Sequence, residues 1–198
     1  MQESEEYTYK NEYTDKSEKK KKNKDGFGIF DVFEAVISAV VVIALIFTFV
    51  FRVVTVDGPS MKPTLQDKDK LVITAWGYKA QHGDIVALYS EKLEKPIIKR
   101  IIAVGGDTVD INFTTGVVTV NGEEEDYTDE LTNQQCDIAF PIIVPEGTVF
   151  VLGDNRGVSE DSRSNLVGCV DTRYIVGKVV GRIFPLGRWS VNENDINE

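Results

Sequence analysis

The chain has 198 residues, 42% of them hydrophobic, which is enough for one domain with a real core plus appendages. Its formal net charge of −10 argues against nucleic acid as a general partner, because phosphate binding requires a basic face. From Thr55 to the end, 14 Lys and Arg stand against 23 Asp and Glu, so this part alone carries −9. We therefore expect it to be an acidic domain of the soluble type.

The N-terminal segment, residues 1–32, is expected to be a disordered cytoplasmic tail. Its first 25 residues are rich in Glu, Asp, Lys, Tyr and Asn and hold almost no aliphatic side chain, so they cannot bury enough apolar surface to pack. Five lysines crowd its later part: Lys19, Lys20, Lys21, Lys22 and Lys24. Such a run is usually solvated, but its place beside an apolar segment bears on membrane topology.

A membrane-length apolar run follows these lysines. Residues 35–51 are 17 consecutive residues without a charge, and extension to residues 33–54 gives roughly 33 Å of helix, enough to cross a bilayer. No polar stripe breaks the run, as a buried core helix would require, and no small-x-small cleavage site follows it. We therefore expect residues 33–54 to be a single transmembrane signal anchor. Because the lysines precede it, the positive-inside rule predicts a cytoplasmic N-terminus and an extracytoplasmic remainder at the cell membrane.

Short β-type runs fill the chain after residue 55. They alternate apolar and polar residues, are rich in β-branched side chains and are separated by Gly, Asp and Asn, while no convincing amphipathic helix occurs. The runs are residues 71–76, 84–90, 96–104, 109–113, 116–121, 148–154 and 174–186. The predicted fold class is mainly β, an antiparallel β-sheet domain over residues 55–198 behind a single N-terminal transmembrane helix.

The domain core is expected within residues 55–104 and 147–190, with an inserted subdomain over residues 105–146. This insert contains a predicted hairpin around residues 114–116 and an acidic cluster at residues 123–126. The cluster lacks the spaced Asp-x-Asp-x-Asp-Gly pattern of a calcium loop. We therefore interpret it as a solvated turn.

Few residues of the chain suit a metal site. Cys136 and Cys169 form no CxxC pair, and His82 is the one histidine, so neither a metal nor another cofactor is expected. The cysteines are either small core residues or the two halves of one disulfide, and spacing does not decide between them. His82 lies in a turn-like segment and is expected to be an exposed loop residue.

A candidate nucleophile lies just after the apolar run. Residues 53–57 read as a short β-branched strand that breaks at Gly58-Pro59, so the Ser60 hydroxyl is presented at a strand end beside which an extended peptide could lie. Gly-Pro-Ser is also common in ordinary turns, where the serine bonds its own backbone. Ser60 therefore needs support from other parts of the chain.

The matching candidate base is Lys99, in the apolar run of residues 96–104. Lys99 and its neighbour Arg100 point to opposite faces of a strand, so only one can face the core. Lys99 either protects an edge strand from aggregation or is desolvated for chemistry, since a Ser-Lys dyad needs no histidine. At an ordinary pKa of about 10.4 a lysine is almost fully protonated at pH 7, so burial would have to lower its pKa.

A third segment, residues 153–163, reads GDNRGVSEDSR directly after an apolar strand. Its composition suits a surface turn. Two arginines and several carboxylates within eleven residues also suit a charge-paired loop that fixes its own shape and offers a hydroxyl to a neighbouring lysine.

Together and in this order, these segments resemble bacterial type I signal peptidases of the Gram-positive kind, membrane-anchored serine endopeptidases with a Ser/Lys dyad. Residues 60–65 (SMKPTL) resemble the nucleophile box and residues 83–86 (GDIV) a structural box. Lys99-Arg100, with residues 105–107 (GGD), resembles the general-base box, and residues 153–163 the GDNR-x-x-S-x-DSR box. The match covers most of the chain after residue 33.

The resemblance implies cleavage of N-terminal signal peptides from exported preproteins after small residues of the Ala-x-Ala type. Ser60 would attack the scissile carbonyl, neutral Lys99 would be the general base, and the Ser60 N–H would help to bind the oxyanion. Ser159 would orient Lys99. A salt-bridged support would come from Arg100, Asp154, Asp161 and Arg163. The implied partners are signal peptides, the lipid bilayer and a nearby protein-export translocon, with no nucleic acid.

The same resemblance implies a shallow apolar groove that accepts alanine side chains and is lined by Val54, Val56, Ile97 and Ile98. One departure is Gly58, where some members carry a serine whose hydroxyl completes the oxyanion hole; a backbone N–H or a water would take its place. Two rivals are weighed against this interpretation. A self-cleaving repressor of the SOS type would need a DNA-binding domain and a cytosolic location, both of which the apolar span excludes. A membrane-anchored scaffold derived from signal peptidases would lack the chemistry, and the presence of both Ser60 and Lys99 argues against it.

Overall fold

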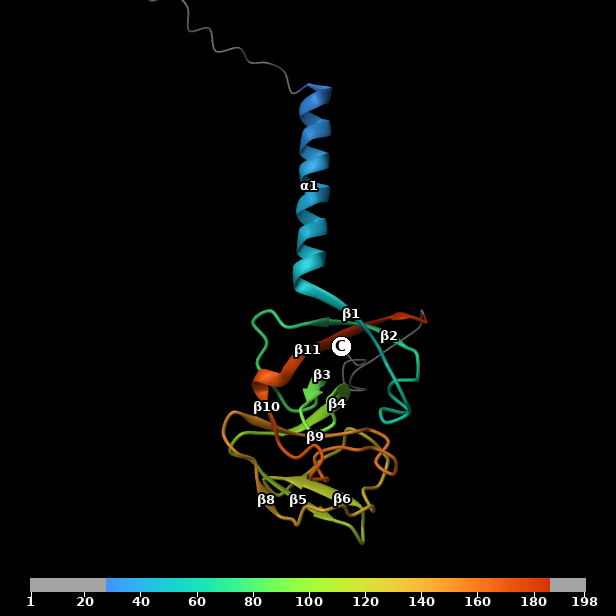
Figure 1. The fold of residues 1–198 in the computed structure, drawn as a ribbon, viewed down its shortest axis with the longest axis vertical. Coiled ribbons are helices and arrows are strands. Elements are labelled where there is room, and N and C mark those ends of the chain that lie inside the picture. The colour runs from blue at the N-terminus through green and yellow to red at the C-terminus, as the bar shows by residue number, and fades with distance from the viewer. Residues whose placement is uncertain (1–27, 186–198) are drawn as a thin grey trace, which may run out of the picture. The chain divides into compact units, whose positions relative to one another are not determined.

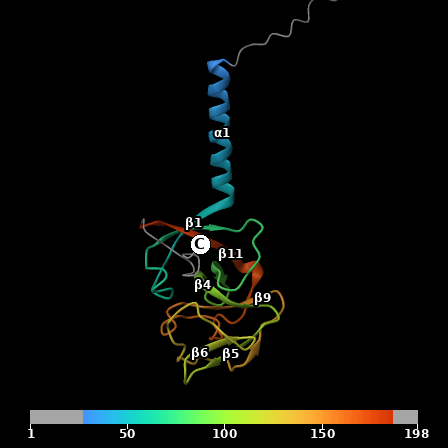
Figure 2. The same cartoon turned by 180° about the vertical axis from the view of Figure 1, so that it is seen from behind.

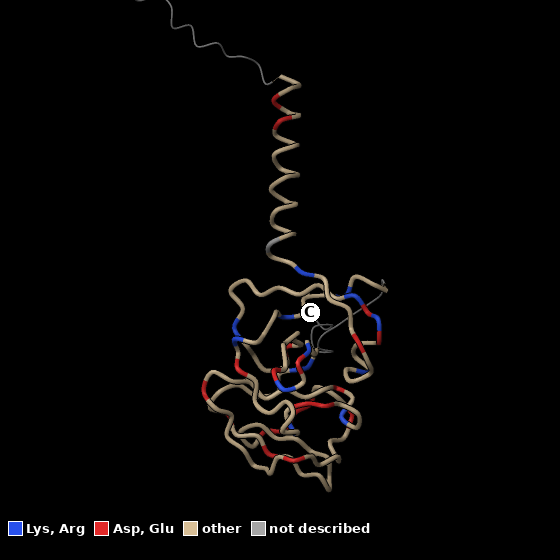
Figure 3. Tube along the Cα trace, in the orientation of Figure 1, with Lys and Arg blue, Asp and Glu red and all other residues tan. Residues whose placement is uncertain are grey.

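The computed structural model describes residues 28–185, so the predicted tail and the end of the chain lie outside the described part. The chain divides into two compact units, up to Ile43 and from Ala44 onward. Helix α1 (Ile29–Val50) begins the described chain and has charged residues only near its start (Figure 3). By length and composition its residues Ile29–Thr48 could cross a bilayer.

The helix begins and ends four residues earlier than the span predicted at residues 33–54. Residues 51–54 belong instead to strand β1 (Phe51–Thr55), which pairs with β2 (Lys70–Thr74), Val53 opposite Val72. The reason is the β-branched run Val53-Val54-Thr55, whose side chains favour a pleated strand with a partner over a free helix end.

The unit from Ala44 onward contains two antiparallel sheets, as predicted for a mainly β fold. The larger sheet has seven strands in the order β1-β2-β11-β3-β4-β9-β10. Its remaining strands are β3 (Ile85–Ser90), β4 (Lys95–Val104), β9 (Thr148–Leu152), β10 (Val170–Asp171) and β11 (Ile175–Phe184), the last preceded by a short 3-10 helix, η1 (Thr172–Tyr174). Strand β4 is therefore central, with β3 and β9 on its two sides, and is not the edge strand that one reading of Lys99 required.

The smaller sheet is built by residues within the predicted insert. Its four strands are β5 (Thr108–Asn112), β6 (Val117–Val120), β7 (Glu123–Glu124) and β8 (Ile142–Ile143), in the order β7-β6-β5-β8. Strands β5 and β6 form the predicted hairpin, with Asn112 opposite Val117. In both views, strands β5 and β6 of the small sheet lie at one end of the unit that begins at Ala44. Strands β1 and β11 lie at its other end, and β4 and β9 lie between the two ends (Figures 1 and 2).

Three apolar clusters form the core of this unit, and the second of them joins the two sheets. The first apolar cluster joins the segment after β1 to β2, β3 and β11; its buried members are Val56, Met61, Leu65, Leu71, Ile73, Ile85, Ala87 and Val179. The second lies between β4, β9 and the small sheet and includes Ile102, Val109 and Phe150. The third includes Val86, Ile101 and Val151. Since Met61 and Leu65 are buried in the first cluster, the chain directly after Ser60 is anchored in the core.

Both cysteines are free thiols, which decides between the two states that the sequence left open. Cys169 packs against the second apolar cluster, and burial raises the pKa of its thiol.

Candidate active site

Lys99 is a buried amine in the middle of the large sheet. It pairs with Val86 of β3, and only 3% of its surface is exposed. Burial lowers the pKa of Lys99 to about 8, because a charged ammonium loses its hydration there. The nearby charges act in both directions: Asp161 and Glu160 raise this pKa, while Arg163 and Lys95 lower it. Within the described residues no hydrogen bond or ion pair involves the Lys99 amine.

Arg100 points to the opposite face of β4 and makes a different kind of contact. Its Nε and Nη2 donate to the two carboxylate oxygens of Asp154 over 2.8 and 2.6 Å, and its Nη1 donates to the Gly83 carbonyl over 2.9 Å. Both members of this ion pair are buried. Thr64, four residues after Ser60, donates its hydroxyl to the same Asp154 carboxylate over 2.5 Å. The nucleophile box and the residue beside Lys99 therefore meet at one carboxylate.

The Ser60 turn is held by the loop of residues 153–163 through its main chain. The Asn155 N–H donates to the Ser60 carbonyl over 3.0 Å, and the Asn155 side chain donates to the Pro59 carbonyl over 3.2 Å. Gly153 lies close to both Ser60 and Ser159. A Cβ atom at residue 153 would be 2.4 Å from the Ser60 carbonyl oxygen and 2.2 Å from the Ser159 hydroxyl oxygen. Only glycine allows this approach, which brings Ser60 and Ser159 to the same point of the loop.

The register of the sheet brings Lys99 to this point as well. Leu152, the last residue of β9, is opposite Arg100, so the next residue, Gly153, continues the antiparallel ladder toward Lys99. Ser60, Lys99 and Ser159 therefore converge on Gly153. In the described residues no hydrogen bond joins the Ser60 hydroxyl to the Lys99 amine; such bonds often form only when substrate closes the site.

The loop itself is fixed by Asp161 and Arg163. Arg163 donates to both Asp161 oxygens, over 2.8 and 3.0 Å, and to the carbonyl of Ser159 over 3.2 Å. Asp161 also accepts the Gly153 N–H over 3.1 Å. The buried Ser159 hydroxyl has no hydrogen-bond partner among residues 28–185. An unsatisfied buried hydroxyl is unusual and is more common at functional sites than in ordinary cores.

Gly58 has a left-handed backbone, with φ of +91°, and its N–H donates to the Asp67 carboxylate over 2.9 Å. That N–H is therefore occupied and is not directed at a substrate oxyanion in this state. A residue with a Cβ would be strained at this φ.

The four residues predicted to line the groove do not all lie together. Val56 is buried in the first apolar cluster, and Val54 and Ile98 pack against it. Ile97 packs against the third cluster instead, with Val86 and Ile101. Ile97 and Ile98 therefore pack against different apolar clusters.

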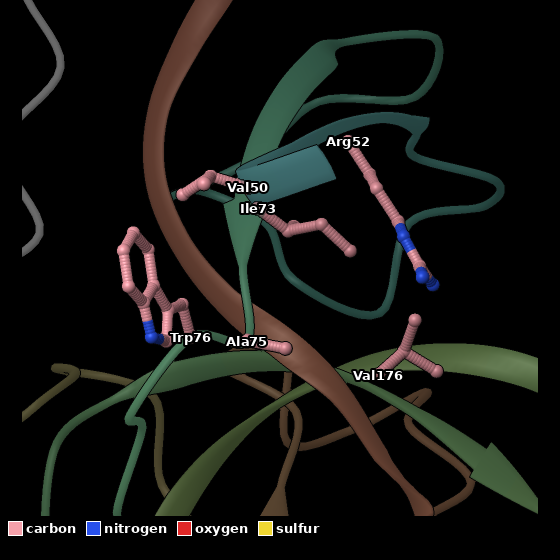
Figure 4. A pocket seen from close by; sticks show the side chains of 6 residues that line it. All are labelled: Val50, Arg52, Ile73, Ala75, Trp76 and Val176. Atoms are coloured by element: carbon pink, nitrogen blue, oxygen red, sulfur yellow. The ribbon is translucent and has the colours of Figure 1, made fainter. Parts of the chain in front are cut away.

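A separate open pocket of about 320 Å³ lies beside the start of β1 (Figure 4). The residues that line it are Val50, Arg52, Ile73, Ala75, Trp76 and Val176. It contains none of the candidate catalytic residues, although Ile73 and Val176 also contribute to the first apolar cluster.

His82 is outside this constellation. Its exposed ring lies 2.7 Å from the Asp107 carboxylate, and no hydrogen bond links it to Ser60 within residues 28–185. In the same part of the chain no three His, Cys, Asp or Glu side chains are grouped to hold a metal ion. Sequence reasoning did not single out Thr64 or Asn155. Thr64 lies inside the nucleophile box, but its contact with Asp154, 90 residues away, has no local signal.

Comparisons with known proteins identify the family of the chain. The family model for signal peptidase, peptidase S26, matches residues 29–184. The chain belongs to this family. It is 32% identical to signal peptidase IB of Staphylococcus aureus strain COL over 84% of this chain and 97% of that protein. It is 34% identical to signal peptidase I P of Bacillus subtilis subsp. natto over 88% of this chain and 96% of that one.

A crystal structure of a signal peptidase I from Enterococcus faecalis V583 is 32% identical, covers 51% of this chain and 97% of its own, and has a TM-score of 0.43. Membership of the family makes the chain a serine peptidase with signal peptides as its substrate class, and a membrane-anchored one.

Proposed function

We propose that this family member is a type I signal peptidase that cleaves exported preproteins with Ser60 as nucleophile and Lys99 as general base. The observation that carries the proposal is the Lys99 amine, which is buried at the centre of the sheet and whose pKa burial lowers to about 8. A lysine in that state is neutral often enough at neutral pH to accept a proton from a hydroxyl.

In the proposed mechanism the Ser60 oxygen attacks the scissile carbonyl carbon while Lys99 takes the hydroxyl proton. The oxyanion of the tetrahedral intermediate is bound by the Ser60 N–H. When the intermediate collapses, Lys99 gives its proton to the leaving amine, which becomes the new N-terminus of the mature protein. The signal peptide remains as an ester on Ser60 until a water, deprotonated by Lys99, attacks the ester carbonyl. When the bond between that carbon and the Ser60 oxygen breaks, the Lys99 ammonium returns the proton to the Ser60 oxygen, and the signal peptide leaves as a carboxylate. Ser159, with its unpartnered hydroxyl, would orient Lys99.

The domain from residue 55 onward would act on the outer side of the cell membrane, with the N-terminal residues 1–32 in the cytoplasm. The lysines before the span support this orientation. Residue 55 follows the candidate span by only seven residues, so β1 is tethered to the bilayer surface where the cleavage site of a translocating preprotein emerges. At this position the domain would lie beside lipid and the export translocon, which are its proposed partners.

The pH dependence of cleavage tests the proposed base. The neutral amine is the reactive form and its pKa is about 8, so kcat/KM should rise from about pH 7 and level off above about pH 9. Steady-state cleavage of a preprotein by the full-length chain in lipid–detergent micelles measures this profile. Ser159→Ala should lower the rate at every pH. A rate that is flat from pH 6 to 10 would exclude Lys99 as the base, and no cleavage at any pH would favour a non-catalytic scaffold.

The groove should discriminate by size through Ile98 and not through Ile97. Ile98→Ala removes a side chain that packs against the first apolar cluster and so enlarges the groove. The ratio of kcat/KM for a preprotein with Val before the cut to kcat/KM for one with Ala should therefore rise about tenfold. Ile97→Ala is the matched control, because its side chain packs against the third cluster. Competition between the two preproteins gives the ratio. An equal shift in both variants would contradict this assignment.

A further inference from the structure

The acidic cluster at residues 123–126 was expected to be a solvated turn, and one of its members is not. Glu123, Glu124 and Asp126 are exposed, whereas the side chain of Glu125 is only 3% exposed. Both Glu125 oxygens accept from Nη2 of Arg156, over 3.0 and 2.8 Å, and the Arg156 side chain is buried too. A buried carboxylate is costly unless it is paired, so this pair has a defined structural task.

Arg156 belongs to the loop of residues 153–163 and uses all three of its nitrogens. Nε donates to the Gly153 carbonyl over 3.1 Å, Nη1 to the Thr132 hydroxyl over 2.8 Å, and Nη2 to Glu125. The Arg156 carbonyl in turn accepts from Nη2 of Arg163 over 2.7 Å. One side chain therefore joins the small-sheet segment to the residue at which Ser60 and Ser159 converge.

Other residues of the same segment contact the second buried pair of the site. The Tyr127 ring lies under the Arg100 guanidinium, 5.5 Å from its centroid, and the Thr128 hydroxyl donates to the Asp154 carbonyl over 3.3 Å. Residues 125–132, which we call the buttress segment, thus contact the loop at Asp154 and Arg156 and contact β4 at Arg100. Among the acidic residues of this segment, Glu125 is the one whose carboxylate is buried and paired with Arg156.

We propose that Glu125 is a positioning residue: acting through Arg156, it holds the loop that carries Ser159 and Asp161 in register with Lys99. The inference rests on the proposed role of Lys99 as base. The charged groups that act on Lys99 are Asp161, Glu160 and Arg163 from the loop and Lys95 from β4. Three of these four charged groups belong to the loop. If the loop loses the Glu125–Arg156 pair, both the position of the Ser159 hydroxyl and the electrostatic potential at the Lys99 amine change.

The test compares Glu125→Gln with Glu124→Gln in the full-length chain. Gln keeps the size of the side chain but removes the charge that pairs with Arg156, and Glu124 is its exposed neighbour in β7. We expect Glu125→Gln to lower kcat about tenfold, with KM changed by less than about twofold, and to move the alkaline rise of the pH profile. Glu124→Gln should match the unsubstituted protein, and Glu125→Asp should recover part of the loss. Unchanged kcat and pH profile in Glu125→Gln would overturn the inference.

Because a lone buried arginine could also unfold the loop, a second variant separates positioning from folding. Glu125→Leu combined with Arg156→Met replaces the ion pair by apolar side chains of similar size, which commonly restores stability. We expect this protein to melt like the unsubstituted one and still to cleave slowly. Normal kcat in the double variant would show that the pair serves folding alone and would refute the positioning role. Lys99→Ala, assayed in parallel, reports on the proposed function separately: if it still cleaves normally, the dyad fails, whatever Glu125 does.

Discussion

Lys99→Met should abolish cleavage, lowering kcat by about 10⁴-fold or more, because the Ser60 hydroxyl would then have no base within the site. Ser60→Ala should have an effect of the same size, and the two losses should not add, since the proposed dyad uses both residues in one proton transfer. The measurement is single-turnover cleavage of a preprotein by the full-length chain.

The matched control is Lys70→Met, an exposed lysine at the start of β2 that is not among the charges acting on Lys99, and it should keep nearly full activity. Activity that survives in Lys99→Met would contradict the dyad.

The same Lys99→Met variant should be more stable than the unsubstituted protein at neutral pH. Burial lowers the pKa of Lys99 in the folded chain from 10.5 to about 8, so the unfolded chain binds more protons between these values. Below about pH 8 the buried ammonium therefore costs on the order of 3 kcal/mol of folding free energy, and this cost fades as the pH rises toward 10.5. The gain in melting temperature on substitution should accordingly be large at pH 7 and small at pH 10, which also shows that a loss of activity is not a loss of fold.

The second large effect concerns Asp154. Asp154→Ala removes the carboxylate that pairs with Arg100 and accepts from Thr64, so the Arg100 guanidinium would lose the carboxylate to which it donates two hydrogen bonds. Breaking a buried pair in this way should lower the free energy of unfolding by about 3–5 kcal/mol and the melting temperature by roughly 10 °C.

The comparison variant for this prediction is Asp171→Ala, which breaks the exposed pair with Arg173 and should change the melting temperature little. Differential scanning calorimetry of the two proteins measures the contrast. Equal melting temperatures would mean that the Arg100–Asp154 pair adds no net stability and that its role is confined to the site.

Local patterns were enough to predict the architecture. Alternation and β-branched residues indicated the strands, and the uncharged run indicated the helix. The helix begins and ends four residues before the predicted span, because the helix and the strand after it are both apolar and only the pairing of Val53 with Val72 separates them. Short motifs indicated Ser60, Lys99 and the loop of residues 153–163. The structure adds that β4 is central, which removes the edge-strand interpretation of Lys99.

What the sequence did not reveal depends on contacts between distant segments. Thr64 meets Asp154 across 90 residues and Glu125 meets Arg156 across 31, and neither contact leaves a local signature. The groove was assigned from resemblance, and the structure adds that Ile97 and Ile98 pack against different apolar clusters.

The way in which the Ser60 turn is held has a practical consequence. Asn155 donates hydrogen bonds to the carbonyls of Pro59 and Ser60, and the buried Met61 and Leu65 fix the chain that follows. None of these contacts involves the hydroxyl oxygen of Ser60. A protein without that oxygen would keep the shape of the turn and the neighbouring apolar walls. It would hold an intact preprotein without cutting it, and would therefore be suitable for capturing the uncleaved complex for crystallography or cross-linking.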